Sequence, residues 1–273
     1  MKSAIRLPSI LVTLSIGLGL ALTGLLLMGL TPATQPARAQ GVIYVDTGAT
    51  SGSNDGTSWT RAFTNVQDAL AVAAYGDEIW VADGVYYPDE GAGQIDDQSS
   101  STFQLVSGVR LYGGFAGRGV SETQRTQRDW AANVTVLSGD LRQDDATDAN
   151  GVVTDTDNIA GVNAYHVTTG SGVTETARLD GFTITAGQAN SAIAPHHSGG
   201  GMLNDAGSPT LANLTFSGNR ANVNGGGMYN EASGPVLTDV TFSGNYVHDG
   251  YGGGMCNASG SNPALTDVSF DNN

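Results

Sequence analysis

The sequence is poor in cysteine, in lysine and in charged residues of either sign. One cysteine, Cys256, stands alone among 273 residues, so no intramolecular disulfide framework can form. Charged residues make up 14% of the chain, aromatic residues 7%, and no lysine follows Lys2. Because cross-links are excluded and charges are few, we expect a regular apolar core to provide the stability.

The first 39 residues have the composition of a secretory signal peptide. Lys2 and Arg6 precede an almost wholly apolar run, Ile10 to Leu30, and Ala37-Arg38-Ala39 then forms an A-x-A cleavage motif. A membrane anchor is the alternative, because the 21 residues of this run could span a bilayer. The cleavage motif and the glycines within the run favour export. We therefore predict a signal peptide over residues 1–39.

Removal of this peptide leaves a strongly acidic chain. It retains 8 basic residues, all arginine, against 26 acidic ones, which is a formal net charge of −18. Nucleic acids and anionic membrane surfaces need a basic footprint, so this balance excludes both as partners. It suits a soluble secreted surface and the binding of cations. Residues 40–273 are enough for one domain and include no apolar run that would span a membrane.

A repeated pattern dominates the chain from about residue 198. The tetrapeptide GGGM recurs at intervals of 26 and 27 residues, and the motif F-x-x-N recurs at intervals of 26 and 28. A fixed period in this range predicts a solenoid, in which each repeat packs only on its neighbours. The two motifs begin at Gly199, Gly225 and Gly252, and at Phe216, Phe242 and Phe270.

The repeats predict strands, not helices. Apolar residues alternate with threonine or serine, as at Leu214 and Phe216, and glycine is too frequent for helical repeats. No hairpin motif is present, so we predict an all-β solenoid of parallel strands stacked about 4.8 Å apart. Equal positions would then form internal columns of phenylalanine, leucine and methionine. The asparagine of F-x-x-N would turn the chain in a left-handed conformation and bond to its copies through its amide.

The glycine triplets have a second interpretation, as phosphate cradles. It is disfavoured because no Lys-Ser/Thr pair and no helical pattern follow them. We expect them to allow turns and close backbone approach that a β-carbon would block.

Upstream segments predict degenerate coils and one helix. Phe63 to Ala73 has helical spacing with one apolar face, so we predict an N-terminal capping helix within a cap at about residues 40–90. Short alternating segments predict further strands at Ile79–Val81, Val109–Leu111, Val134–Val136, Tyr165–Val167 and Leu179–Ile184.

Several segments resemble a known superfamily. They are IYVDTGATSGSNDGTSWTRAFTNVQDALAVAAYGDEIWVADGVYYP (43–88), YGGFAG (112–117), QRDWAANVTVLSGD (127–140) and LDGFTIT (179–185). Together they resemble bacterial right-handed parallel β-helix proteins of the pectin-lyase-like superfamily. The later repeats resemble those of chlamydial polymorphic outer-membrane proteins, which more often have GGA plus an apolar residue. The resemblance covers nearly all of residues 40–273. It implies a right-handed parallel β-helix that is secreted or held at the cell surface or outer membrane.

The repeat continues to Asn273, the last residue. We expect the chain to be truncated there, so that further coils of the same longer protein would pack on the last repeat.

The acidic stretch from Asp140 to Asn158 is the strongest candidate for a metal site. Asp148, Asn150, Gly151 and Asp157 match positions three, five, six and twelve of a calcium loop, although position one would be Ala146. Two nearby aspartates could replace the missing ligand. Calcium is thus the one candidate cofactor, and a solvated acidic loop is the alternative. The predicted ligands are Asp144, Asp145, Asp148, Asn150 and Asp157.

A second polar set recurs on the strands. Asn213, Asp239 and Asp267 occupy equal repeat positions and should point outward, where stacked carboxylates repel unless they are solvated or bridged by a cation. The resemblance implies that polysaccharide lyases of this fold hold calcium on such a face and abstract a sugar proton with a basic residue, often arginine. Arg178 and Arg220 lie nearby in the sequence. A plain polar face is the alternative.

Two histidines, His196 and His197, precede the first GGGM, and His248 precedes the third. Without a cysteine or aspartate at ligand spacing, we interpret them as polar loop residues.

Function remains open between two classes. The repeated polar positions favour a non-catalytic stalk, similar to an adhesin, that presents loops to a polysaccharide or to another host or cell-surface ligand. The alternative is a polysaccharide lyase or hydrolase acting on an acidic polysaccharide. An active site would need different polar residues clustered at one level along the axis of the solenoid. No catalytic residue is assigned from the sequence.

Overall fold

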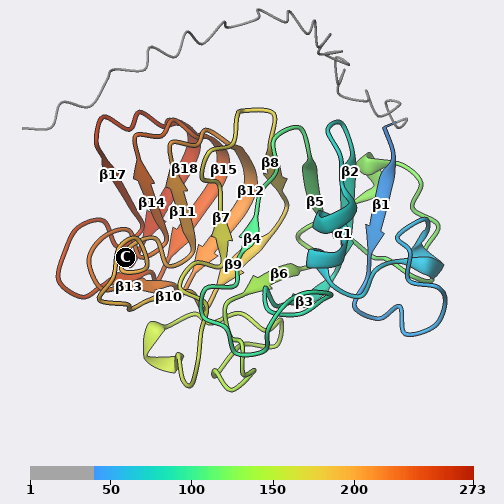
Figure 1. Ribbon diagram of the computed structural model, residues 1–273, viewed down its shortest axis with the longest axis horizontal. Helices are drawn as coiled ribbons and strands as arrows, with labels where there is room; N and C mark the ends of the chain where they lie inside the picture. Colours follow the sequence, from blue (N-terminus) through green and yellow to red (C-terminus); the bar gives the residue numbers. More distant parts are fainter. Residues whose placement is uncertain (1–39) are drawn as a thin grey trace, which may run out of the picture. The chain divides into compact units, whose positions relative to one another are not determined.

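The computed structural model describes residues 40–273, and the predicted signal peptide lies outside the described residues. Every ladder between strands of this part is parallel. The strands form three sheets, of which the largest is strongly curled (Figure 1). The fold is therefore all-β and solenoid-like, as the period predicts.

The largest sheet runs through successive coils. Its order is β1 (Val42–Val45), β2 (Glu78–Ala82), β5 (Arg110–Phe115), β8 (Arg178–Asp180), β12 (Thr210–Ser217), β15 (Val236–Ser243) and β18 (Ala264–Asp271). The second half of β12 also pairs with β9 (Thr183–Thr185), which leads to β6 (Thr135–Ser138) and β3 (Gly84–Tyr86).

Two smaller sheets complete the coils. One contains β4 (Phe103–Gln104), β7 (Thr168–Thr169), β11 (Met202–Asp205), β14 (Met228–Glu231) and β17 (Met255–Ala258). The other contains β10 (Gln188–Ala189), β13 (Arg220–Ala221) and β16 (Tyr246–Val247). Inward residues of the largest sheet and of the five-stranded sheet share one apolar core.

The predicted columns are present in register. Phe216 pairs with Phe242 and Phe242 with Phe270, and successive ring centroids lie 4.8 and 4.9 Å apart. The leucine and methionine positions pair in the same way. The prediction that every phenylalanine of the column is buried is wrong for the third one. Phe270 is 48% exposed because it lies on the last coil, whereas Phe216 and Phe242 are fully buried.

The predicted asparagine ladder is also present. Asn219 Nδ2 donates to Asn245 Oδ1 at 3.0 Å, and Asn245 Nδ2 donates to Asn273 Oδ1 at 2.8 Å. The left-handed backbone belongs to the preceding residue instead, which is glycine in the first two copies, as at Gly218 with φ of 60°, and Asn272 with φ of 51° in the third. A second, unpredicted ladder joins Asn204, Asn230 and Asn257.

The glycine triplets allow the close approach that was predicted. A β-carbon added at Gly201 would lie 2.5 Å from the carbonyl oxygen of Gly227 in the next coil. The first glycine of the triplet, Gly199, has φ of 78° and turns the chain.

One α-helix, α1 (Val66–Val72), lies within the predicted helical segment. The Asn65 side chain caps it by accepting the N–H of Asp68 at 2.8 Å, and Val66 and Ala69 are buried in the core beside β1 and β2. Short 3₁₀ helices are η1 (Trp59–Arg61), η2 (Arg125–Gln127) and η3 (Thr156–Asn158). Within residues 40–273 no helix has the length and apolarity needed to cross a membrane.

The remaining strand predictions hold with two exceptions. The segment 179–184 is divided between β8 and β9, because Gly181 and Phe182 lie outside both strands. The segment Tyr165–Val167 is not a strand, and pairing begins at β7. The reason is that neighbouring residues bond to different segments: the Tyr165 N–H donates to Ser99 O, and the Val167 N–H donates to Gly200 O.

Candidate functional site: an arginine-lined cleft

Three neighbouring strands place unlike polar groups on the outer face of the largest sheet. The register aligns Glu78 of β2 with Arg110 of β5 and Arg178 of β8. One pleat further on, Tyr112 aligns with Asp180. The residues between these two columns, such as Leu111, are buried in the core, so the polar columns face outward.

An excursion between β5 and β6, residues 116–134, adds two more arginines to this face. The side chain of Gln127 ties its 3₁₀ turn together, because Oε1 accepts the N–H groups of Thr123 and Gln124, each at 2.8 Å. This turn places Arg125 and Arg128 over Tyr112, with guanidinium carbons 4.7 and 5.0 Å from the ring centroid.

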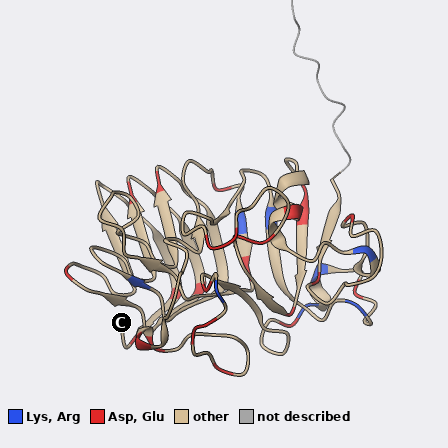
Figure 2. Ribbon diagram, turned by 60° about the horizontal axis from the view of Figure 1, so that its bottom comes forward, with Lys and Arg blue, Asp and Glu red and all other residues tan. Residues whose placement is uncertain are grey.

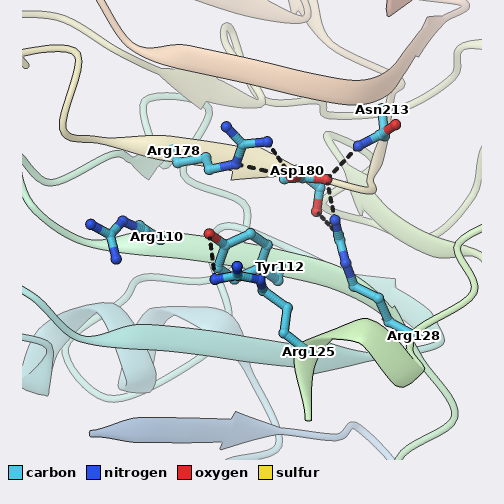
Figure 3. A pocket seen from close by; sticks show the side chains of 7 residues that line it. All are labelled: Arg110, Tyr112, Arg125, Arg128, Arg178, Asp180 and Asn213. Atoms are coloured by element: carbon cyan, nitrogen blue, oxygen red, sulfur yellow. Dashed lines mark hydrogen bonds and ion pairs between the residues drawn. The ribbon is translucent and has the colours of Figure 1, made fainter. Parts of the chain in front are cut away.

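The result is an open cleft of about 520 Å³ whose lining carries four arginines (Figure 3). The side chains of Arg110, Arg125 and Arg178 are 44%, 45% and 31% exposed, whereas that of Arg128 is only 9% exposed. Tyr112, Asp180 and Asn213 complete the lining.

Asp180 is buried at the base of the cleft and is saturated with hydrogen bonds. Its Oδ1 accepts from Arg128 Nη2 at 2.7 Å and from Asn213 Nδ2 at 2.8 Å. Its Oδ2 accepts from Arg178 Nε and Nη2 at 2.9 and 2.6 Å. Because both oxygens are occupied, this carboxylate has no free position from which to act as a base or a nucleophile.

Arg128 fastens the excursion to the sheet. Besides Asp180 Oδ1, its guanidinium donates to the carbonyl oxygens of Gly113 and Asp180, and it lies 4.7 Å from the ring centroid of Trp130. With these contacts its role is structural. Burial raises the pKa of the adjacent Tyr112 hydroxyl, so this group stays neutral.

The other arginines keep donors for a ligand. Arg125 Nη1 donates to Glu78 Oε1 at 2.7 Å and to the Tyr112 hydroxyl at 3.2 Å, which leaves its other N–H groups unused. Arg110 Nη1 lies 4.0 Å from the same Glu78 oxygen, and its guanidinium donates no hydrogen bond to any described residue.

The cleft is a local excess of positive charge on an acidic protein. Four guanidinium groups face two carboxylates, those of Glu78 and Asp180, while basic residues are scarce over the rest of the described chain (Figure 2). Guanidinium groups bind carboxylate, sulfate and phosphate through paired N–H donors. The cleft can therefore hold an anionic group.

The predicted calcium ligands fall into two sets. Asp144 and Asp145 lie beside Asp140, with ligand atoms of all three within 4.8 Å of one another. Burial raises the pKa of Asp145 to about 6.

The other three predicted ligands belong to separate turns. Asp148 Oδ1 accepts the N–H groups of Asn150 and Val152 at 2.8 and 3.0 Å, and Asp157 lies in η3. The structure therefore does not bring all five predicted ligands together as one group.

The second predicted polar set is also divided. Asn213, Asp239 and Asp267 lie at equal left-handed positions, with φ of 50°, 54° and 52°. Asn213 joins the cleft through Asp180, whereas the two aspartates are exposed on later coils. Arg178 lines the cleft, but Arg220 lies in β13 of another sheet.

Arg110, Arg125 and Arg128 were not predicted as site residues. One signal was available: half of the arginines of residues 40–273 fall between positions 110 and 128 of an acidic chain. Their convergence depends on the path of the excursion, which no periodic pattern describes.

Comparison with known proteins identifies no relative of this chain. No protein-family model matches it, and searches of curated proteins and of solved structures found no significant match. The superfamily resemblance of the sequence motifs therefore stays a prediction, and the functional argument rests on the residues of the cleft.

Proposed function

We propose that this chain is a right-handed parallel β-helix protein, exported to the cell surface or the medium, that binds an acidic polysaccharide in the arginine cleft without catalysing its cleavage. The parallel, curled and stacked sheets support the fold, and the signal-peptide composition supports the location.

The observation that carries the ligand class is the convergence of four guanidinium groups on one open face. Arg110 and Arg125 are half exposed and retain unused donors, so a carboxylate of a sugar could accept two N–H bonds from either. The volume of about 520 Å³ lies in the range of small-ligand sites, and the open side would allow a polymer to cross the cleft.

The state of the two carboxylates favours binding over catalysis. A glycosidase needs one carboxylate as acid and another as base or nucleophile, and a lyase needs a free base at the sugar. Asp180 is saturated, and Glu78 holds Arg125 with one oxygen and the Trp80 indole N–H with the other, at 2.7 and 2.9 Å. Catalysis at this cleft would require one of these groups to be released.

Binding of polygalacturonate, measured by affinity electrophoresis and calorimetry with a neutral glucan as control, tests the proposal. The double variant Arg110→Ala/Arg125→Ala should bind at least about tenfold more weakly, because charge-assisted hydrogen bonds contribute about 1.5–3 kcal/mol each. The matched control Arg61→Ala/Arg142→Ala removes two arginines of similar exposure, 51% and 50%, outside the cleft and should bind as the wild type does.

Equal weakening in both double variants would show that net charge, and not the cleft, attracts the polymer. Absence of binding by the wild type would refute the ligand class. Appearance of new reducing ends or of unsaturated products would refute the non-catalytic part and support the enzyme alternative.

A further inference from the structure

A second hollow lies on the outer face of the largest sheet, between the segment that precedes α1 and the excursion 116–134. Its volume is about 420 Å³, and residues 58–60 and 119–123 line it together with Tyr44 of β1. The indole N–H of Trp59 donates to the carbonyl oxygen of Glu122 at 3.0 Å, across 63 positions of the chain. This bond fixes the two walls of the hollow to each other.

The lining of the hollow offers hydroxyl groups but no free ionic group. Glu122 is 4% exposed, and its two carboxylate oxygens accept the backbone N–H groups of residues 116–117 at 3.2 and 3.0 Å. No lysine or arginine belongs to the lining. The hydroxyl groups of Tyr44, Ser121 and Thr123 make no hydrogen bond to any described residue, so they are available to a ligand. We call this hollow the neutral pocket.

Tyr44 provides the aromatic wall of the neutral pocket. The residues on either side of it, Ile43 and Val45, are buried in the core, so its own side chain faces outward. Trp59 and Trp80 hold its ring edge-on, with ring centroids 4.8 and 5.8 Å away. A pyranose ring combines apolar C–H faces with hydroxyl groups, and it therefore fits an aromatic wall bordered by free hydroxyl groups.

The neutral pocket lies close to the arginine cleft. In the register of the sheet, Tyr44 pairs with Trp80, and Trp80 pairs with Tyr112, which lines the cleft. Adjacent strands are about 4.8 Å apart, so the strands that carry the two tyrosines are about 10 Å apart. Along the chain, Thr123 lines the pocket and Arg125 lines the cleft. A polymer bound in the cleft therefore passes within reach of the pocket.

We infer that the neutral pocket binds an uncharged sugar residue of the polymer whose carboxylate lies in the arginine cleft. The inference rests on the proposed function and adds a preference for a polysaccharide that carries both acidic and neutral residues. An acidic sugar is disfavoured in the pocket, because its carboxylate would lose water there without gaining a cation. A volume of about 420 Å³ lies in the range of small-ligand sites.

Two forms of polygalacturonate test the inference, one fully acidic and one partly methyl-esterified. They share the sugar and the linkage and differ in charge. The measured quantity is the Kd of the acidic form divided by the Kd of the esterified form, in which effects common to both forms cancel.

Ser121→Trp fills the pocket from an exposed position, so the protein should fold. The Kd ratio should fall at least about fivefold, because the neutral sugar loses its aromatic contact and its hydrogen bonds. Tyr44→Phe keeps the ring and removes only the hydroxyl group, and it should lower the ratio at least about twofold.

The matched control is Ser51→Trp, which places the same side chain at an exposed serine outside the pocket and should keep the wild-type ratio. An unchanged ratio in Ser121→Trp, or an equal fall in the control, would overturn the inference but leave the arginine cleft as the binding site of the acidic form. Absence of binding of both forms by the wild type would refute the proposed function and the inference with it. Dimerisation of the wild type in light scattering that Ser121→Trp abolishes would assign the pocket to a second copy of the chain instead.

Discussion

Residues 198–273 and residues 40–197 have the same parallel strand arrangement but differ in regularity. In the later part β12, β15 and β18 are each eight residues long, and identical residues stack from coil to coil. In the earlier part the coils are interrupted by excursions, residues 116–134 and 139–167. Both candidate sites, the arginine cleft and the neutral pocket, use residues of the first excursion. Repetition stabilises the solenoid, and its interruption brings unlike residues together.

The largest expected effect concerns the stacked phenylalanines of the regular part. Phe242→Ala removes a fully buried ring between two others and should lower the free energy of unfolding by about 4 kcal/mol. Phe270→Ala removes the same group where it is 48% exposed and should cost about 1 kcal/mol. Urea denaturation measures both free energies of unfolding. Equal losses in the two variants would show that stacking of a ring between two others adds no stability.

The next effect concerns the asparagine ladder. Asn245→Ala removes the acceptor of the buried Asn219 backbone N–H and the donor to Phe216 O, while the Asn219 side-chain amide keeps Ile184 O and Ser217 O as acceptors. We expect a loss of about 3 kcal/mol in urea denaturation. Asn257→Ala, at the exposed end of the second ladder, should cost less than about 1 kcal/mol. A similar loss of stability in the two variants would show that burial does not determine how much a ladder asparagine contributes.

A smaller effect belongs to the irregular part. His166 is buried, its Nδ1 bonds to Gly199 O and its Nε2 to His196, and burial lowers its pKa from 6.5 to about 4. The unfolded chain therefore takes up a proton below pH 6.5 that the folded chain does not, so stability falls as the pH decreases. Between pH 7 and pH 5 this contribution is about 2 kcal/mol.

The variant His166→Gln should lack this part of the pH dependence. His248→Gln, which changes a histidine whose side chain is 66% exposed, should keep the wild-type slope. Urea denaturation at several pH values measures the difference, and parallel curves for the wild type and His166→Gln would contradict the assignment to His166.

Much of the scaffold was predictable because its signals are local or repeated. Alternation of Leu214 and Phe216 predicts a strand, the spacing from Phe63 to Ala73 predicts a helix, and the 26-residue period aligns Phe216 with Phe242. The period places Phe270 in the internal column but does not by itself predict how exposed it is, because burial also depends on whether another coil packs on the residue.

The candidate sites were predictable only in part. Asp144 and Asp145 were predicted as possible ligands, but Asp140, which lies beside them, was not, because the prediction followed the fixed spacing of a calcium loop. Arg178 was predicted as a candidate basic residue, but the other arginines of the cleft were not predicted. A template of fixed spacing cannot predict which residues of an excursion meet, because residues from its two ends, such as Asp145 and Asn163, come together where it leaves the sheet and returns.

The sequence by itself determined the class of structure: parallel β coils in register, an N-terminal helix, and an acidic chain with no lysine after Lys2. Each of these follows from composition or from contacts between equal positions, which a period specifies. Only the tertiary structure decided which unlike residues meet. Arg128 reaches Asp180 across 52 positions, and Asn163 reaches Asp145 across 18. Such contacts depend on where a non-repeating excursion returns to the sheet, and that path is set by packing and long-range hydrogen bonds, which the local pattern does not contain.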